Sequence, residues 1–558
     1  MTARSSVGGR GNMQSGTRTI LFVAFPLLLA AAGAAQSRQP APAGAPATPR
    51  ALFESADRCQ ACHNGLTTPS GQDVSIGAAW RTTMMANAAR DPYWHAAVRR
   101  ESIDYPAAQA DIEAECSKCH MPMARVEAHA AGREGSVFAN LPIGAHATRS
   151  ALLAADGVSC SVCHQITKDK LGTRESLVGG FVIDFATPWG SRNMFGPFEV
   201  DRGRTTIMRS ATSFQPGQGT HIQSSELCAT CHTLYTHSLA PGAAPGEMPE
   251  QVPYQEWEHS VFKDTQSCQS CHMPVVTEPV RISSVWGEPR EGVSRHTFPG
   301  GNFLMMRIFA RYGHELGVTV APQEFERAAA QTIEHLQAES ASVVIDRAQV
   351  SDGRLEVLLK VDNRAGHKLP TAYPSRRAWI HLEVRDAASR PIFESGAIRP
   401  NGAIVGNDND EAEGRVEPHY AIIDRPDQVQ VYEAVMVDPK GTPTTGLLTA
   451  VRFLKDNRLP PRGFDKKTAP AEVAVRGSAA EDVDFVGGQD QVSYVVQTGG
   501  APGPFTVRAA LRYQPIGYRW ADNLRPYRSM ETERFVRYYD SLAETNSVIL
   551  AQASATSR

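Results

Sequence analysis

The pattern of hydrophobic and polar residues changes near residue 340. From residue 51 to residue 340, apolar residues recur at helical spacing only over short stretches, and long alternating segments are not evident. We expect helices over residues 84–100, 150–155, 303–312 and 325–336. This part of the chain is therefore predicted to be mainly α-helical or irregular.

After residue 340, hydrophobic and polar residues alternate in short segments bounded by Gly, Pro, Asn or Asp, as in half-buried β-strands. The predicted strands cover residues 341–346, 354–361, 378–385, 391–394, 428–437, 448–454, 491–497 and 505–513. About eight short strands at this spacing favour an antiparallel β-sandwich, with an immunoglobulin-like arrangement as one form of it. The apolar and aromatic positions that follow predict a C-terminal helix over residues 529–551.

An apolar run precedes both regions, covering residues 20–29 and grading into alanines up to residue 35. Three arginines come before it, Arg4, Arg10 and Arg18, and small residues end it. This order predicts a secretory signal peptide over residues 1–35, cleaved near Ala35. A membrane anchor is the alternative, because the whole run approaches the length that spans a bilayer. No later segment is long and apolar enough to do so.

These patterns predict an α+β, multidomain fold. The expected parts are a signal peptide (1–35), a Pro/Ala-rich linker (36–50), a helical or irregular domain (51–340), a β-sandwich-like domain (341–528) and a C-terminal helix and tail (529–558). A mature length of about 520 residues agrees with two or more domains. The net charge of −3 gives no argument for a nucleic-acid partner.

One cysteine motif recurs five times in the region before residue 340. Each copy has the form C-x-x-C-H, and the five copies contain all ten cysteines of the chain. The copies are Cys59/Cys62/His63, Cys116/Cys119/His120, Cys160/Cys163/His164, Cys228/Cys231/His232 and Cys268/Cys271/His272. Composition alone would produce only about 0.005 such strings. The motif attaches c-type haem: the two thiols form thioethers and the imidazole ligates the iron.

Short helices are expected to carry several of these motifs. In each copy the two cysteines and the histidine stand at positions i, i+3 and i+4, which fall on one face of a helix.

Three other interpretations explain the motifs less well. Disulfides are compatible with an exported protein, but they give no reason for the histidine after each second cysteine. Four-cysteine zinc sites pair C-x-x-C units, and five units cannot be shared evenly. Thioredoxin-like chemistry needs one C-x-x-C in a βαβ context. We therefore expect five covalent haem c groups in residues 51–340.

The density of motifs limits how far apart these haems can be. A compact unit of about 290 residues has a radius of gyration of about 19 Å. Five haems in that volume would lie within electron-tunnelling distance of their neighbours. The low aromatic content, 7%, fits a core that is filled in large part by porphyrin.

The remaining histidines include the candidates for the second axial ligand of each iron. We place His296, His221 and His367 first: His296 and His367 lie near Pro and Gly residues, and His221 is seven residues before Cys228. A second group consists of His129, His146, His237 and His259, with His95, His314, His335 and His419 ranked lower. His381 lies in a strand-like alternation and is expected to be an exposed strand residue.

One acidic segment, Asn407–Glu411, has oxygen ligands at the short spacing of a Ca²⁺ loop. It lacks the full EF-hand pattern, so we favour a solvated acidic turn over a calcium site.

With these residues in view, the chain resembles multihaem c-type cytochromes of the cytochrome c-552/4 group, which includes the electron acceptor of hydroxylamine oxidoreductase. The resemblance rests on the five motifs, on residues 157–166 (GVSCSVCHQI), on C-H-M-P at 119–122 and 271–274, and on H-T-F-P-G-G from His296. It covers roughly residues 51–340. The β-rich part, with G-H-K-L-P-T at 366–371, looks like the tail of some exported multihaem cytochromes.

The resemblance implies that bis-histidine haems relay electrons in this chain. Its five motifs depart from the four haems of the best-known relative, so that protein's ligand pairing cannot be copied. We expect an exported pentahaem cytochrome, periplasmic or extracellular, that transfers electrons between a donor and an acceptor protein. We expect no nucleic-acid partner and no transmembrane span after signal cleavage; peripheral membrane association stays open.

Two other functions are kept as alternatives. One is a haem enzyme whose open-faced iron acts on a small nitrogen or sulfur compound, such as hydroxylamine, nitrite or tetrathionate; it would need acid or base groups beside that iron. The other is a docking role for the β-rich region, which is compatible with electron relay.

Overall fold

The computed structural model describes residues 51–244 and 246–557. The predicted signal peptide and linker lie outside these residues. Within them, no helix is both long enough and apolar enough to cross a membrane.

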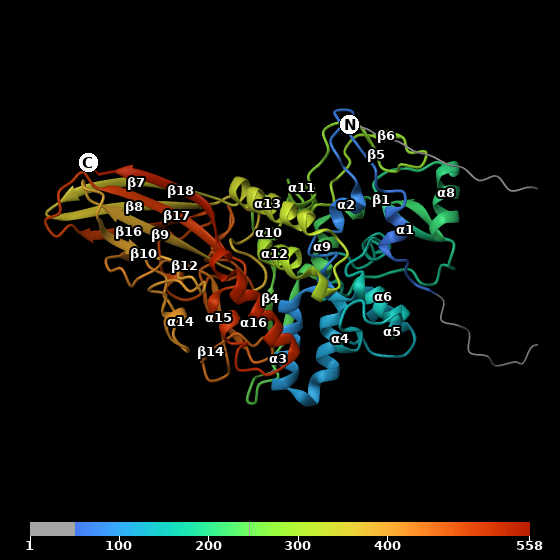
Figure 1. The fold of residues 1–558 in the computed structure, drawn as a ribbon, viewed down its shortest axis with the longest axis horizontal. Helices are drawn as coiled ribbons and strands as arrows, with labels where there is room; N and C mark the ends of the chain where they lie inside the picture. The colour runs from blue at the N-terminus through green and yellow to red at the C-terminus, as the bar shows by residue number, and fades with distance from the viewer. Residues whose placement is uncertain (1–50, 245, 558) are drawn as a thin grey trace, which may run out of the picture. The chain divides into compact units, whose positions relative to one another are not determined.

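Short helices joined by long irregular segments dominate the chain up to residue 340 (Figure 1). The helices are α1 (Ala56–Gln60), α2 (Ile76–Trp80), α3 (Pro92–Asp104), α4 (Gln109–His120), α5 (Pro122–Ala130), α6 (Arg149–Ala155), α7 (Cys160–Cys163), α8 (Arg202–Thr212), α9 (Ser225–His232), α10 (Pro253–Glu258), α11 (Cys268–His272), α12 (Phe303–Tyr312) and α13 (Pro322–Glu339). Three two-stranded sheets accompany them: β1 (Arg192–Gly196) with β2 (Phe214–Gln218), β3 (Leu234–His237) with β4 (Glu247–Gln251), and β5 (Val280–Arg281) with β6 (Pro289–Arg290).

Three of the four helices predicted in this region are confirmed, as α6, α12 and α13. The predicted helix over residues 84–100 is wrong in its first half, because α3 begins only at Pro92. Asp91 caps this helix by accepting hydrogen bonds from the backbone N–H groups of Tyr93 (2.8 Å) and Trp94 (3.1 Å). Proline at the first helical position lacks the N–H that a continuous helix would require.

The chain beyond residue 340 forms mainly antiparallel sheets. Its strands are β7 (Ala341–Ser351), β8 (Arg354–Asn363), β9 (Arg377–Arg385), β10 (Pro391–Ser395), β11 (Ile422–Ile423), β12 (Val431–Tyr432), β13 (Ala434–Val437), β14 (Pro443–Thr444), β15 (Arg452–Asp456), β16 (Gln489–Gln497), β17 (Thr506–Gln514) and β18 (Val548–Thr556). One sheet has the order β10-β9-β17-β18, with β12 also on β9; a second has the order β11-β16-β8-β7, and a third β14-β13-β15. The helices of this region are α14 (Asp408–Glu411), α15 (Tyr518–Asp522) and α16 (Met530–Leu542).

The predicted C-terminal helix is correct only in its first half. Ser529 caps α16, which ends at Leu542, and β18 then pairs antiparallel with β17. The side chain of Asn546, between the two, is fully buried and donates to the carbonyl of Ile516 at 2.8 Å. This fixed turn ends the helical segment, and the alternating residues after it complete the sheet rather than extend a helix.

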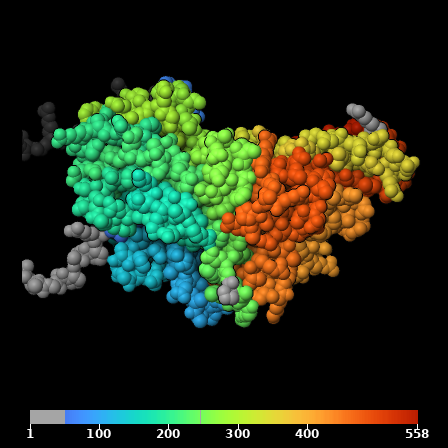
Figure 2. All heavy atoms as spheres, turned by 180° about the vertical axis from the view of Figure 1, so that it is seen from behind, coloured from blue at the N-terminus to red at the C-terminus, as the bar shows by residue number. Residues whose placement is uncertain are grey.

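The helical and β-rich regions share their largest hydrophobic core. Phe303 and Phe309 of α12 and Phe325 of α13 belong to the same buried cluster as Leu359 of β8 and Leu382 of β9. Polar contacts cross the boundary as well: the N–H of Val261 donates to the carbonyl of Arg462 at 2.9 Å. Figure 2 shows this junction, where light-green residues near 260 lie against the orange residues of the β-rich region.

A buried polar cluster lies in the β-rich region around His419, which is 6% exposed. Its Nδ1 accepts from the side-chain amides of Gln430 (2.7 Å) and Asn457 (3.1 Å), so the proton is on Nε2 and points to Asp482 at 3.1 Å. Asp490 lies beside it, fully buried; its Oδ2 accepts from Gln430 and Tyr432, whereas its Oδ1 has no hydrogen-bond donor among the described residues. Burial raises the pKa of Asp490 to about 6.

This shift predicts a pH-dependent stability. Between the ordinary pKa of 3.8 and the native value of about 6, the folded protein binds more protons than the unfolded chain. The free energy of unfolding should therefore fall as pH rises through this range, by about 3 kcal/mol from Asp490 alone. Asp490→Asn should remove that loss, so its stability relative to wild type should rise between pH 4 and pH 7 in urea denaturation. Asp346→Asn, at an exposed position of β7, is the control; equal pH profiles for Asp490→Asn and wild type would contradict the prediction.

Candidate functional site

Four of the five C-x-x-C-H motifs have both cysteines on a short helix, as expected. The motifs at 116–120 and 228–232 form the C-terminal turns of α4 and α9, and those at 160–164 and 268–272 make up most or all of α7 and α11. Helical spacing of i, i+3 and i+4 places both thiols and the imidazole on one side of each turn.

The first motif departs from this expectation at Cys62. Helix α1 ends at Gln60, so Cys59 is helical, whereas Cys62 and His63 lie in the turn that follows. The carbonyl of Cys62 faces Ser284 instead of a helical N–H, and it accepts from the backbone N–H (2.8 Å) and the hydroxyl (3.0 Å) of that residue. These bonds come from a segment 222 residues away, which a local pattern could not predict.

The turn still keeps Cys62 beside its motif partners. The backbone N–H groups of Cys62 and His63 both donate to the carbonyl of Cys59, at 3.1 and 3.0 Å. The chain therefore stays coiled through the motif although the regular helix has ended. The predicted thioether role of Cys62 needs only this proximity, and it stays a prediction.

All ten cysteines of the motifs are free thiols, which removes the disulfide interpretation. Nine are partly buried and Cys271 is exposed. The partly buried ones are Cys59, Cys62, Cys116, Cys119, Cys160, Cys163, Cys228, Cys231 and Cys268.

Zinc is not supported by the arrangement of the motifs. Among the described residues, the group of side chains close enough together to share a metal ion is His419, Asp482 and Asp490, outside the motifs. Its imidazole is a poor metal donor, because two amide donors occupy Nδ1 and leave the proton on Nε2. The motif cysteines do not gather into four-sulfur sites in this part of the chain.

Four of the five motif imidazoles are oriented by a backbone carbonyl. The Nδ1 atoms of His63, His120, His164 and His272 lie 2.5, 3.1, 2.5 and 2.6 Å from the carbonyl oxygens of Ile282, Ala88, Phe195 and Pro299. Each Nδ1–H donates to its carbonyl, so the lone pair is on Nε2. A histidine that ligates a metal through Nε2 has this second hydrogen bond.

Desolvation by the surrounding chain favours the neutral form of these imidazoles, as metal ligation requires. Desolvation lowers the pKa of His120 and His232 to about 4, and it also lowers the pKa of His63, His164 and His272. The donor set therefore fits haem c: two thiols and one neutral imidazole at each motif.

Two motif imidazoles face a second imidazole. The ring centres of His164 and His296 are 6.3 Å apart with planes at 20°, and those of His272 and His367 are 6.2 Å apart at 13°. With metal–nitrogen bonds of about 2.0 Å, two imidazoles on opposite sides of one metal have centres roughly 6.4 Å apart.

His335 is a third ring at this separation, and sequence reasoning ranked it low. Its centre lies 6.4 Å from His272, with the planes at 54°. It belongs to α13, where a lone histidine on a helix gives no signal of ligation. His367 differs from it in being oriented, because its Nδ1–H donates to the carbonyl of Lys368 at 2.9 Å.

The structure places His221 differently from His296 and His367. Its Nε2, rather than its Nδ1, lies 2.9 Å from a carbonyl, that of Ile166, and its ring packs edge-on against Phe195. His221 is therefore near the motif at 160–164, but the described residues do not show it opposite a motif imidazole.

Each of the other histidines is either exposed to solvent or hydrogen-bonded through its ring. His129, His146, His237 and His314 are exposed. Both ring nitrogens of His95 are used, by the carbonyl of Ala89 and the guanidinium of Arg534. His381 pairs with Glu394 on the sheet surface, and His259 uses Nδ1 to bond the carbonyl of Gln255.

The motifs contact one another in a branched order. Three pairs of thiols from different motifs lie close enough to change each other's pKa. Cys59 raises the pKa of Cys160 well above its ordinary value, Cys231 raises that of Cys119, and Cys268 raises that of Cys228. Two further observations extend this order: Cys268 N–H donates to Ser225 Oγ (3.0 Å), and Cys163 and Cys231 lie close enough that Cys231 contributes to the raised pKa of Cys163. The motif at 228–232 therefore adjoins the motifs at 116–120, 160–164 and 268–272, and the motif at 59–63 adjoins 160–164.

The acidic segment Asn407–Glu411 does not form an open calcium loop. Asp410 is buried and pairs with both terminal nitrogens of Arg377 (2.8 and 2.9 Å), while Asp408 and Glu411 pair with Arg415 and Arg399. Its carboxylates are thus neutralised by arginines rather than free for a cation. Asn407 caps α14.

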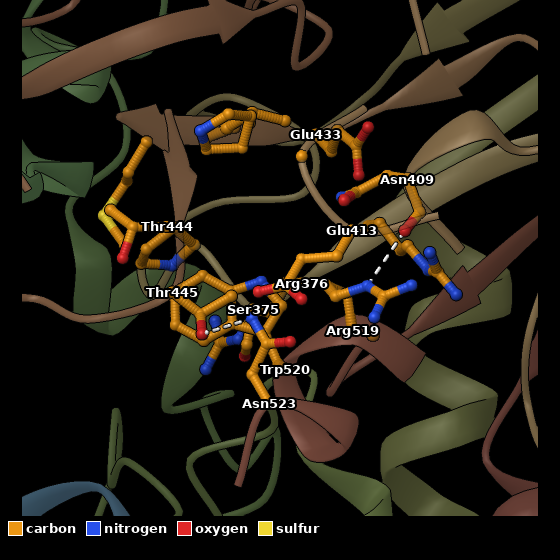
Figure 3. A pocket seen from close by; sticks show the side chains of 18 residues that line it. Ser375, Arg376, Asn409, Glu413, Glu433, Thr444, Thr445, Arg519, Trp520 and Asn523 are labelled. Atoms are coloured by element: carbon orange, nitrogen blue, oxygen red, sulfur yellow. Dashed lines mark hydrogen bonds between the residues drawn. The ribbon is translucent and has the colours of Figure 1, made fainter. Parts of the chain in front are cut away.

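A small polar cavity opens beside this segment (Figure 3). Its volume is about 30 Å³, room for roughly two water molecules. Arg519 closes one side by donating from Nε to the carbonyl of Asn409 at 2.9 Å. The cavity is too small for a haem or an organic substrate.

Comparison with known proteins finds a structural counterpart for this fold. The sequence matches no family model and no curated protein. The crystal structure of a penta-heme cytochrome c552 from Thermochromatium tepidum is similar over 90% of this chain and 99% of that chain, with a TM-score of 0.50 and 14% sequence identity. At this identity the likeness shows that the two chains share a fold.

Proposed function

We propose that the protein is an exported pentahaem c-type cytochrome that relays electrons between redox proteins. The observation that carries this proposal is the set of five motifs whose imidazoles are neutral and, in four cases, held with Nε2 free. The fold shared with a penta-heme cytochrome supports it. In this proposal the ten cysteines anchor five haems, and His63, His120, His164, His232 and His272 are the proximal ligands.

Bound haem would supply an iron that alternates between Fe(II) and Fe(III). The chain's own residues do the rest: the carbonyls of Ile282, Ala88, Phe195 and Pro299 fix the rings and increase their basicity. The contacts between motifs give a branched path with the motif at 228–232 in its middle. Such a path suits electron entry and exit at different surfaces.

We assign the second axial ligands from ring geometry. His296 would hold the haem of the 160–164 motif together with His164, and His367 would hold that of the 268–272 motif together with His272. His367 comes from the loop between β8 and β9, so the β-rich region would finish a site that the helical region begins. His221 stays a candidate that would bind through Nδ1, because its Nε2 is committed to Ile166.

A specific observation also favours an enzymatic alternative. In the described residues no second imidazole lies near 6.3 Å from His63, His120 or His232. The ring of His120 stacks on Trp94 at 4.2 Å. A haem there could keep one face open for a small nitrogen or sulfur compound, such as hydroxylamine, nitrite or tetrathionate. Relay remains the first proposal, because two of the five sites already face a second imidazole.

Export, location and partners complete the proposal. The signal peptide predicted over residues 1–35 would deliver the chain to the periplasm or the cell exterior, and a donor and an acceptor protein would be its partners. Peripheral membrane association is compatible with this location.

Two measurements on the purified protein test the proposal. Mass spectrometry should find five covalent haems per chain; another number would mean that a motif has been misread. Optical spectra of the reduced protein should show low-spin haem that is unchanged by CO or nitrite. A high-spin haem that binds either one would replace simple relay with the enzymatic alternative.

The ligand assignments predict which variants gain a high-spin haem. His296→Ala should convert one haem of five from low spin to high spin in ferric electron paramagnetic resonance (EPR) spectra, because it removes the ring opposite His164. His367→Ala should do the same when combined with His335→Ala, since His335 could otherwise replace the missing ring. His381→Ala is the control, being paired with Glu394 on the sheet. A low-spin His296→Ala protein would exclude His296 as a ligand.

A further inference from the structure

Four charged side chains form a buried network between the helical and β-rich regions. Glu256 of α10 and Lys368 are fully buried, and Asp456 and Arg458 are 2% and 5% exposed. Two are cations and two are anions, so the network is balanced within itself. Buried charges are retained only where each has a partner, and here every one does.

The network is closed by direct ion pairs. Arg458 binds Asp456 with two nitrogens, both at 2.8 Å, and reaches Glu256 at 3.0 Å with a third. Lys368 Nζ donates to Asp456 at 2.7 Å. Glu256 is therefore connected to Lys368 through Arg458 and Asp456, across the boundary between the two regions.

The same network holds the backbone of the loop that carries His367. The second oxygen of Glu256 accepts from the backbone N–H of Lys368 (3.1 Å) and from the hydroxyl of Thr371. The loop is then pinned from the β-rich side: Leu369 exchanges two backbone hydrogen bonds of 2.9 Å with Leu459.

Two hydrogen bonds also hold His367 itself. Its Nδ1–H donates to the carbonyl of Lys368 (2.9 Å), and its own carbonyl accepts from Asn363 (2.8 Å). Both backbone groups of Lys368 are thus used, the N–H by Glu256 and the carbonyl by the His367 ring. A shift of this residue would turn the ring away from His272, 6.2 Å away.

We infer that Glu256, acting with Lys368, Asp456 and Arg458, is a positioning residue for His367 as an axial haem ligand. The inference rests on the proposed function, since it requires haem at the motif of His272. The network fixes the loop relative to α10, and α10 is in turn fixed to the motif at 228–232, where Gln255 bonds Thr233 at 3.3 Å. An arrangement that served stability alone would have no need to bond the residue that orients the imidazole.

The test compares variants of the full-length holoprotein by ferric EPR spectroscopy, with haem counted by mass spectrometry. Glu256→Ala should give a high-spin signal from one haem of five, matching that of His367→Ala combined with His335→Ala. Glu256→Gln keeps an oxygen for the Lys368 N–H and should restore most of the low-spin signal. Glu258→Ala, two residues along the same helix and 31% exposed, is the matched control and should stay low spin.

Each outcome bears on a different step. A wild-type spectrum for Glu256→Ala, beside a high-spin His367/His335 double variant, overturns the positioning role and leaves the ligation intact. A low-spin double variant that still carries five haems overturns both the ligation and the positioning role, whereas relay stands. Absence of covalent haem in the wild type would refute the proposed function itself.

A second variant keeps the test decisive if Glu256→Ala fails to fold. If Glu256→Ala does not accumulate with five haems, Lys368→Met removes one anchor while leaving Asp456 paired with Arg458. It should also show a high-spin haem, and a fully low-spin spectrum would overturn the inference.

Discussion

Hydrogen bonds from the motif imidazoles to backbone carbonyls are the constraint on which the rest of the structure depends. Each carbonyl comes from a segment well separated in sequence: Ile282 is 219 residues after His63, and Pro299 is 27 residues after His272. To place those carbonyls, the irregular segments must follow one path around the motifs. The bonds therefore fix both the rings and the connections between helices too short to define a fold alone.

The β-rich region extends this constraint rather than standing apart from it. Its strands share a hydrophobic core with α12 and α13, and its β8–β9 loop brings His367 opposite His272. The buried charges around Glu256 lie where the two regions meet, so the contact that stabilises the junction also holds the loop. The packing of the junction and the placement of the His367 ring are thus coupled at one place, which gives a reason for charged residues at a position that apolar ones could fill.

The sequence predicted the motifs and much of the secondary structure, because both are local signals. Helix α12 follows from its apolar spacing, and β8 and β17 from their alternation. Two helix ends could not be predicted in the same way: α16 stops where Asn546 bonds Ile516, 30 residues away, and α1 stops before Cys62, whose carbonyl bonds the distant Ser284.

The pairing of histidine rings was also beyond a local reading of the chain. His296 and His367 were proposed from neighbouring Pro and Gly, whereas His335 on a regular helix carried no local signal. Ring pairing is a long-range property, and only the fold shows it.

Electron counting tests the central claim that all five motifs hold redox centres in one connected protein. In a coulometric titration of the purified protein, this account predicts that each chain takes up five electrons and returns all five to an oxidant without added substrate. Fewer than five electrons per chain, or a fraction that cannot be recovered, would contradict it.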